Sequence, residues 1–221
     1  WSDRIVYTCS DLGVTNYLFR ATDASGNQTV ISRTVTIEDN TTPTVVAQDF
    51  TVSLGADGTA TVATTDIDNG STDDCTVDSY SLDISSFDCT NLGANTVTLT
   101  VTDGSGNTAT ATQTVTVVDD IDPTITAPVD VTVSVDAASC EATGVALGSP
   151  TTDDNCSVDT TTSDAPAVFP LGDTVVTWTV TDGSGNTATA TQTVTVVDDI
   201  DPTITAPVDV TVSVDAASCE A

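Results

Sequence analysis

Aspartates gather at recurring points of this sequence, with a spacing that would suit a metal ion. Asp119, Asp120 and Asp122 stand before Pro123, and the same run recurs 79 residues later. Carboxylate oxygens are hard ligands of the kind that Ca²⁺ takes, about six to eight at a time. The sequence therefore predicts Ca²⁺ binding at the repeat junctions, with these candidate ligands: Asp119, Asp120, Asp122, Asp182, Asp198, Asp199 and Asp201.

Asp182 belongs to this set because it opens a glycine-rich hairpin that ends at Asn186. In a β-sandwich, such a hairpin is expected at the end of the domain where the preceding linker enters. Asp182, together with Asp153 and Asp154, is therefore expected to approach the linker that contains Asp119. A less specific interpretation stays open, in which the aspartates are turn residues, solubilising charges and guards of sheet edges. Ca²⁺ is the only cofactor that the sequence predicts.

Cysteine chemistry points to disulfides. The sequence has six cysteines and no histidine, and it lacks the CxxC pairs that are typical of zinc sites. Spacings of 14 and 16 residues favour two bonds, Cys75–Cys89 and Cys140–Cys156. Closing loops of about 15 residues would stabilise each repeat by roughly 3 kcal/mol, and such bonds need an oxidising compartment. Cys9 and Cys219 are expected to have partners outside this sequence, and free thiols are the alternative interpretation.

Charge and residue types argue against several classes of function. The sequence has 33 acidic residues against 3 basic ones, and no basic residue follows Arg33. Such a surface would repel nucleic acids and anionic membranes, and no apolar run is long enough to span a bilayer. Histidine and lysine are absent and the serines lack a nearby base, so we expect no enzyme. Trp178 alternates with Val176 and Val180, which favours a place in the core over a sugar-stacking surface.

Internal repeats define the organisation of the chain. Residues 100–142 recur unchanged at 179–221, and an older copy of the same hairpin begins at Asp23, 80 residues before Asp103. A repeat of about 80 residues is therefore expected. The predicted domains are a truncated repeat at 1–39, complete repeats at 40–119 and 120–198, and the start of a further repeat at 199–221. We expect a segment of a longer chain, whose first partners are neighbouring repeats.

Alternating residues predict the strands that position these groups. Valine and threonine alternate over residues 131–135 and 187–197, which is the period of a half-buried strand. Short strands, glycine turns and the lack of a helical period predict an all-β fold of tandem immunoglobulin-like antiparallel β-sandwiches. Phe169 and Leu171 are expected to join the same core as Trp178.

Three motifs in the third repeat resemble the hyalin repeat (HYR) domain. They are Asp-Asn-Cys at 154–156, Phe-Pro-Leu-Gly at 169–172 and Thr-Asp-Gly-Ser-Gly-Asn at 181–186. The resemblance weakens in the second repeat, where only Leu92 and Gly93 keep the second motif. It implies an immunoglobulin-like module of extracellular adhesion. HYR domains often carry a further cysteine pair, which this sequence lacks, and that difference fits long threonine-rich arrays on bacterial surfaces.

These features lead to two hypotheses about function. In the first, the chain is a structural stalk or filament segment of a very large secreted adhesin on the bacterial cell surface. It would extend a distal adhesive region and serve gliding motility or surface attachment. In the second, each repeat is a binding module that recognises glycans or proteins and gains avidity from repetition. Binding of a repeat-only fragment to sugars or surfaces would favour the second hypothesis.

Overall fold

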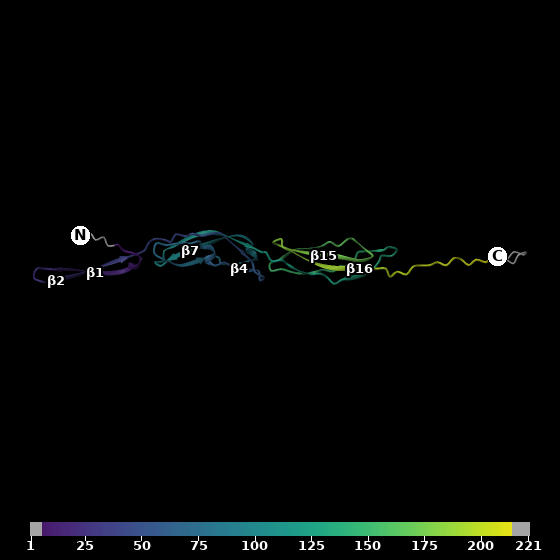
Figure 1. Ribbon diagram of the computed structural model, residues 1–221, viewed down its shortest axis with the longest axis horizontal. Helices are drawn as coiled ribbons and strands as arrows, with labels where there is room; N and C mark the ends of the chain where they lie inside the picture. The colour runs from purple at the N-terminus through teal and green to yellow at the C-terminus, as the bar shows by residue number, and fades with distance from the viewer. Residues whose placement is uncertain (1–5, 214–221) are drawn as a thin grey trace. The chain divides into compact units, whose positions relative to one another are not determined.

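The computed structural model describes residues 6–213, which form two compact units (Figure 1). Among these residues, the first unit contains the range 6–123 together with the loops Asp153–Asp159 and Thr181–Thr187. The second unit contains Thr124–Thr152, Thr160–Val180 and the range 188–213. Strands make up nearly all of the regular secondary structure in both units, so the predicted all-β fold is confirmed. No helix among the described residues is long and apolar enough to cross a membrane.

The first unit has a four-stranded sheet in the order β3-β8-β7-β5, a small β4-β6 sheet and a separate β1-β2 hairpin. Its strands are β1 (Gly13–Thr22), β2 (Gln28–Ile37), β3 (Phe50–Ser53), β4 (Thr59–Thr61), β5 (Val77–Leu82), β6 (Ser86–Asp88), β7 (Gly93–Asp103) and β8 (Thr108–Val118). Its helical turns are η1 (Cys9–Asp11), α1 (Thr64–Ile67) and η2 (Cys89–Asn91).

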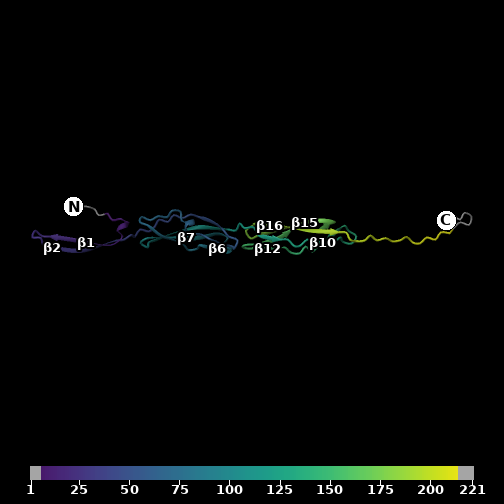
Figure 2. The same cartoon turned by 60° about the horizontal axis from the view of Figure 1, so that its bottom comes forward.

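The second unit repeats this plan. Its main sheet has the order β10-β16-β15-β13, and two-stranded sheets join β11 to β14 and β9 to β12. Figure 2 labels four of these strands, β10, β12, β15 and β16. Its strands are β9 (Thr124–Thr126), β10 (Val131–Ser134), β11 (Glu141–Thr143), β12 (Thr151–Asp153), β13 (Val158–Ser163), β14 (Val168–Pro170), β15 (Gly172–Asp182) and β16 (Thr187–Val197). The loops Asp153–Asp159 and Thr181–Thr187 of the first unit include the end residues of β12, β13, β15 and β16.

The main sheets are not wholly antiparallel, which corrects one detail of the predicted fold. β3 pairs with β8 in parallel, and β10 pairs with β16 in the same way. β3 and β10 are four-residue strands near the start of each repeat, and β8 and β16 are the last strands. The chain enters each repeat at one end and leaves it at the other, so the two strands of each pair point in the same direction. Adjacent strands that point in the same direction pair in parallel.

Alternation along the strands produces the two cores. In β7, Val97, Leu99 and Val101 are fully buried while the threonines between them are partly exposed. Trp178 on β15 is also buried, so its predicted place in the core is confirmed. Its indole Nε1 donates a hydrogen bond to Oε1 of the fully buried Gln192 at 3.1 Å. That bond gives the indole N–H the partner that burial requires.

Leu171 does not join this core, although the sequence suggested it. Phe169 is buried in the middle of β14, but Leu171 is 52% exposed. Its backbone N–H donates to the carbonyl of Cys140 at 3.1 Å, and the next residue, Gly172, has φ +99°. The chain therefore turns at this point, and the alternation that buries Phe169 does not extend to Leu171.

Candidate functional site at the repeat junctions

The hairpin after β7 is closed by the side chain of Asp103. Its Oδ1 accepts the backbone N–H groups of Ser105 and Asn107 at 2.9 and 2.7 Å, and its Oδ2 accepts Nδ2 of Asn107 at 2.7 Å. Gly106 has φ +91°, a conformation that glycine adopts without steric cost. This is why the motif reads Asp-Gly-Ser-Gly-Asn. Asp182 closes the hairpin between β15 and β16 in the same way.

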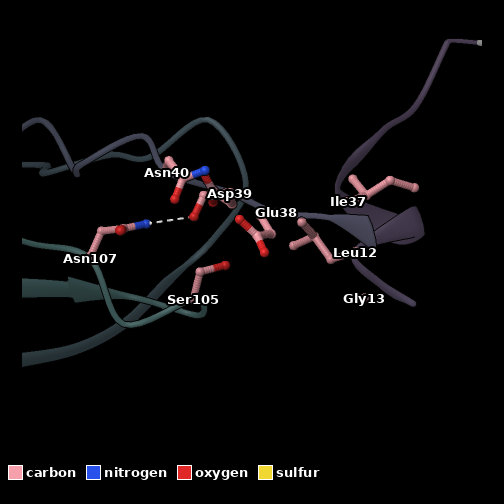
Figure 3. Close-up of a pocket in the computed structure, with 8 residues that line it drawn as sticks. All are labelled: Leu12, Gly13, Ile37, Glu38, Asp39, Asn40, Ser105 and Asn107. Carbon is pink, nitrogen blue, oxygen red and sulfur yellow. Dashed lines mark hydrogen bonds between the residues drawn. The ribbon is translucent and has the colours of Figure 1, made fainter. Parts of the chain in front are cut away.

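The asparagine of each hairpin also contacts a junction. Nδ2 of Asn107 donates to the carbonyl of Asp39 at 3.0 Å (Figure 3). Nδ2 of Asn186 donates to the carbonyl of Asp119 at 3.1 Å. Figure 3 shows Asn107 and Ser105 facing the segment of Asp39, which lines a surface pocket of the first unit. One amide therefore fixes the hairpin turn and holds it against the linker.

These contacts create two clusters of three carboxylates. The first cluster is Asp39, Asp73 and Asp103, and the second is Asp119, Asp154 and Asp182. In each cluster, one carboxylate oxygen from every residue lies within 4.8 Å of the others. Each cluster combines three equivalent aspartates. One lies in the linker (Asp39 or Asp119), one lies two residues before a cysteine (Asp73 or Asp154), and one opens the hairpin (Asp103 or Asp182).

Some oxygens of these clusters are buried without a hydrogen-bond partner. They are Oδ2 of the linker residues Asp39 and Asp119, and Oδ1 of the loop residues Asp73 and Asp154. The other oxygen of each residue has a partner; Oδ2 of Asp154, for example, accepts the backbone N–H of Cys156 at 2.9 Å. Buried polar atoms are rarely left unpaired, so these four oxygens need an explanation.

Hydrogen bonding also fixes the charge of the hairpin aspartates. Burial raises the pKa of Asp103 and Asp182, but the hydrogen bonds from Asn107, Asn186 and the turn backbone outweigh it. The pKa of each carboxyl therefore lies below its usual value. Although only 2% of each residue is exposed, both remain ionised at neutral pH.

The structure brings together only part of the predicted ligand set. Asp119 and Asp182 meet, and Asp154 joins them. Asp120 instead accepts the hydroxyl of Ser53 at 3.0 Å, and Asp199 accepts that of Ser134 at 2.8 Å. The other predicted residues lie in no acidic cluster among residues 6–213: Asp122, Asp198 and Asp201.

The first cluster, at Asp39, Asp73 and Asp103, was not predicted. Its linker, residues 38–43, is an eroded form of the Asp-Asp-Ile-Asp-Pro run that keeps only one of the three aspartates, Asp39. The signal was nevertheless present, because Asp39 stands 80 residues before Asp119 and Asp103 stands 79 before Asp182.

The predicted disulfide pairing is wrong. Cys75, Cys89 and Cys156 do form disulfides, but the bonds are Cys9–Cys75 and Cys89–Cys156, with Cα–Cα distances of 5.4 and 5.5 Å. Cys140 is a free, exposed thiol, and Cys219 lies outside the described residues. The prediction relied on short sequence separations, whereas the observed bonds span 66 and 67 residues. Each bond links a cysteine that lies three residues before a Leu-Gly pair to the cysteine of an Asp-Asp-Cys or Asp-Asn-Cys sequence further along the chain.

Glycine at position 58 makes room for the second disulfide. Gly58 has φ +70°, and a Cβ placed there would lie 2.6 Å from the carbonyl oxygen of Asn155 and 3.0 Å from the sulfur of Cys89. The amide of Asn155 in turn donates to Oδ1 of Asp119 at 3.1 Å. The disulfide and the second acidic cluster therefore share one loop, Asp153–Asp159.

Residues 118–196 match the model of the HYR domain family. This confirms the resemblance over the residues that carry its three motifs. The match singles out no gliding adhesin, and a search of curated proteins found no match.

Solved structures with similar arrangements are cadherin fragments. Domains 1–4 of protocadherin gamma B7 align with a TM-score of 0.34 and 14% identity over 90% of this chain, which spans 62% of that structure. Mouse cadherin-23 domains 22–24 give 0.34 and 16% over 88% of this chain and 78% of the other. Human mucin-like protocadherin domains 1–2 give 0.33 and 15% over 71% and 98%. Because these TM-scores are below 0.5, the assignment of the HYR domain depends on the family match alone.

Proposed function

We propose that this chain is a load-bearing structural segment of a large extracellular adhesin on a bacterial cell surface. One observation carries the proposal: two disulfides at equivalent positions, Cys9–Cys75 and Cys89–Cys156, join residues 66 and 67 positions apart. With the repeat boundaries proposed below, each bond connects one sequence repeat to the next. A protein whose repeats act independently has no need of such bonds. The acidic composition and the HYR domain support an extracellular location.

The proposed mechanism concerns how tension passes along the chain. Sheet hydrogen bonds hold each repeat, and a pulled repeat lengthens by releasing its enclosed residues. A disulfide removes the residues between its cysteines from the extensible path, because force then passes through the sulfur atoms. We propose the repeat boundaries 40–119 and 120–198 for this array, so that both bonds cross a boundary.

Pulling a single molecule by its two ends tests this proposal. Bonds that span 66 and 67 residues would each withhold roughly 230 Å of extended chain, at about 3.5 Å per residue. Reduction should therefore lengthen the fully unfolded chain by about that amount per disulfide. Bonds within repeats, spanning 14 and 16 residues, would add only about 50 Å each. An increase of that smaller size would contradict the proposal.

The finer role proposed is that of a stalk which extends a distal adhesive region during gliding or surface attachment. The alternative is a repeated module that itself binds glycans or proteins through avidity. Applying the chain to glycan arrays and to whole cells, as a monomer and as a multimer, separates the two. Binding that strengthens on multimerisation would replace the stalk proposal, whereas an inert chain with the disulfide-limited length would support it.

We further propose that the chain is not an enzyme. The sequence contains no histidine and no lysine, and its paired aspartates recur in successive copies. A structural repeat has no need of an active site in every copy. Incubation with glycan and peptide libraries should therefore yield no product, and turnover that is lost on an aspartate substitution would contradict this.

A further inference from the structure

Both acidic clusters concentrate negative charge without a basic residue to balance it. Three carboxylate oxygens approach within 4.8 Å in each cluster. The sequence has no lysine or histidine, and its last arginine is Arg33. Neighbouring anions at this distance repel one another strongly where water is excluded. A bound cation would offset that repulsion.

The unpaired oxygens indicate where such a cation would lie. Asp119 is 8% exposed, and its Oδ2 is buried without a hydrogen-bond partner. Oδ1 of Asp154, in the same cluster, is also buried and unpaired. Equivalent atoms are unpaired in the other cluster, Oδ2 of Asp39 and Oδ1 of Asp73. The same two atoms are thus left free in two repeats of different sequence, which argues against chance.

We propose that each cluster is a Ca²⁺ site, with Asp39, Asp73 and Asp103 as ligands of one ion and Asp119, Asp154 and Asp182 as ligands of the other. The ligands of both sites are carboxylate oxygens, which suit a hard cation. Cys75 lies beside Asp39, but its sulfur is in a disulfide and supplies no thiolate.

Ca²⁺ fits these sites better than Mg²⁺ for a geometric reason. The three aspartates come from a linker, a loop and a hairpin, and several of their other oxygens already accept hydrogen bonds. The protein oxygens of such a set surround the ion irregularly, and water molecules must complete its coordination shell. Ca²⁺ accepts variable geometry, whereas Mg²⁺ demands a near-ideal octahedron.

The ion would hold three segments that the backbone connects only loosely. In the second site these are the linker at Asp119, the loop at Asp154 and the hairpin at Asp182. The loop is the one that Cys156 anchors through its disulfide. This inference goes beyond the proposed function, because cation binding would stand even if the chain bore no load.

Calorimetric titration of the oxidised 221-residue chain with CaCl₂, after removal of metal with EDTA, tests the inference. We expect two ions per chain among the described residues, with a Kd of about 10⁻⁴ to 10⁻³ M, as in extracellular calcium modules. Mg²⁺ should bind more weakly. The melting temperature should rise with Ca²⁺ and fall back with EDTA.

Isosteric variants assign the ligands. Asp119→Asn and Asp154→Asn should each remove the same ion and leave one, and Asp39→Asn should remove the other. The matched control is Asp23→Asn. Asp23 closes a hairpin through the same hydrogen bonds from Ser25 and Asn27, but it lies in no acidic cluster of residues 6–213. This control should leave two ions.

If a variant binds no Ca²⁺, its melting temperature in EDTA distinguishes loss of the ligand from loss of the fold. Asp119→Asn removes a buried charge, so without Ca²⁺ it should melt at the same or a higher temperature than the unsubstituted chain. With saturating Ca²⁺ it should melt at a lower temperature. Absence of binding heat together with an unchanged melting temperature would overturn the inference, as would two ions retained in Asp119→Asn and Asp154→Asn.

Discussion

Removal of the disulfide between Cys89 and Cys156 should loosen the first unit by a predictable amount. The bond spans 67 residues, and closing a loop of that length in the unfolded chain is worth about 4 kcal/mol in the chain-entropy model. Cys89→Ala combined with Cys156→Ala should therefore lower the free energy of opening of β7, which begins at Gly93 just after the turn that contains Cys89, by about that amount. Alanine avoids placing a hydroxyl against the first core, where both cysteines pack.

Hydrogen exchange followed by mass spectrometry measures the free energy of opening of β7 itself. A loss of about 4 kcal/mol corresponds to roughly a thousandfold faster exchange of the slowest amides. Cys140→Ala is the matched control, because Cys140 is exposed and free. It should change nothing, and reduction of the unsubstituted chain, which also breaks Cys9–Cys75, should speed the exchange of β7 at least as much as the double variant does. Unchanged exchange in the double variant, or fast exchange in Cys140→Ala, would refute the reasoning.

Two further predictions concern single residues. Gly58→Ala should destabilise the first unit more than Gly70→Ala: both glycines have positive φ, but only at Gly58 would the new Cβ meet a backbone oxygen, at 2.6 Å. Equal shifts in urea midpoint would show that the close contact is unimportant. A hydrogen bond from the backbone N–H of Thr98 holds the pKa of Asp83 below its usual value. The ionised Asp83 therefore stabilises the folded chain above about pH 4. This stabilisation is lost as the pH falls through the pKa that Asp83 has in the folded chain. The urea-midpoint difference between the unsubstituted chain and Asp83→Asn should shrink between pH 7 and pH 3; a constant difference would contradict the pKa shift.

Strand positions could be predicted because alternation has a direct physical cause. One face of each strand is buried, so Val176, Trp178 and Val180 had to face the core together. The approach of Asp182 to Asp119 was likewise predictable, since the ends of a sandwich bring its hairpins near its linkers. Parallel pairing of β10 with β16 was not, because a residue pattern specifies a face and not a partner strand.

Disulfide partners were beyond local reasoning, since sequence separation does not measure distance in a folded chain. A different use of the repeats would have found them. Equivalent cysteines should pair equivalently, and Cys9–Cys75 and Cys89–Cys156 have separations of 66 and 67. The predicted pairs joined Cys75 and Cys156 to residues that are not equivalent. The exposure of Leu171 was missed for a related reason, because a turn ends the alternation just after Phe169.

Cleavage at glutamate tests the central claim, that disulfides join successive repeats. Glutamate occurs only at positions 38, 141 and 220, so a glutamate-specific protease should separate the segments that contain Cys9, Cys89 and Cys156. The experiment uses the Cys140→Ala variant, with its remaining free thiols blocked and the chain denatured. Mass spectrometry without reduction should find these three segments as one species, which reduction divides into three. Release of the segment 1–38 before reduction, or separation of the segment that begins at residue 142, would contradict the claim.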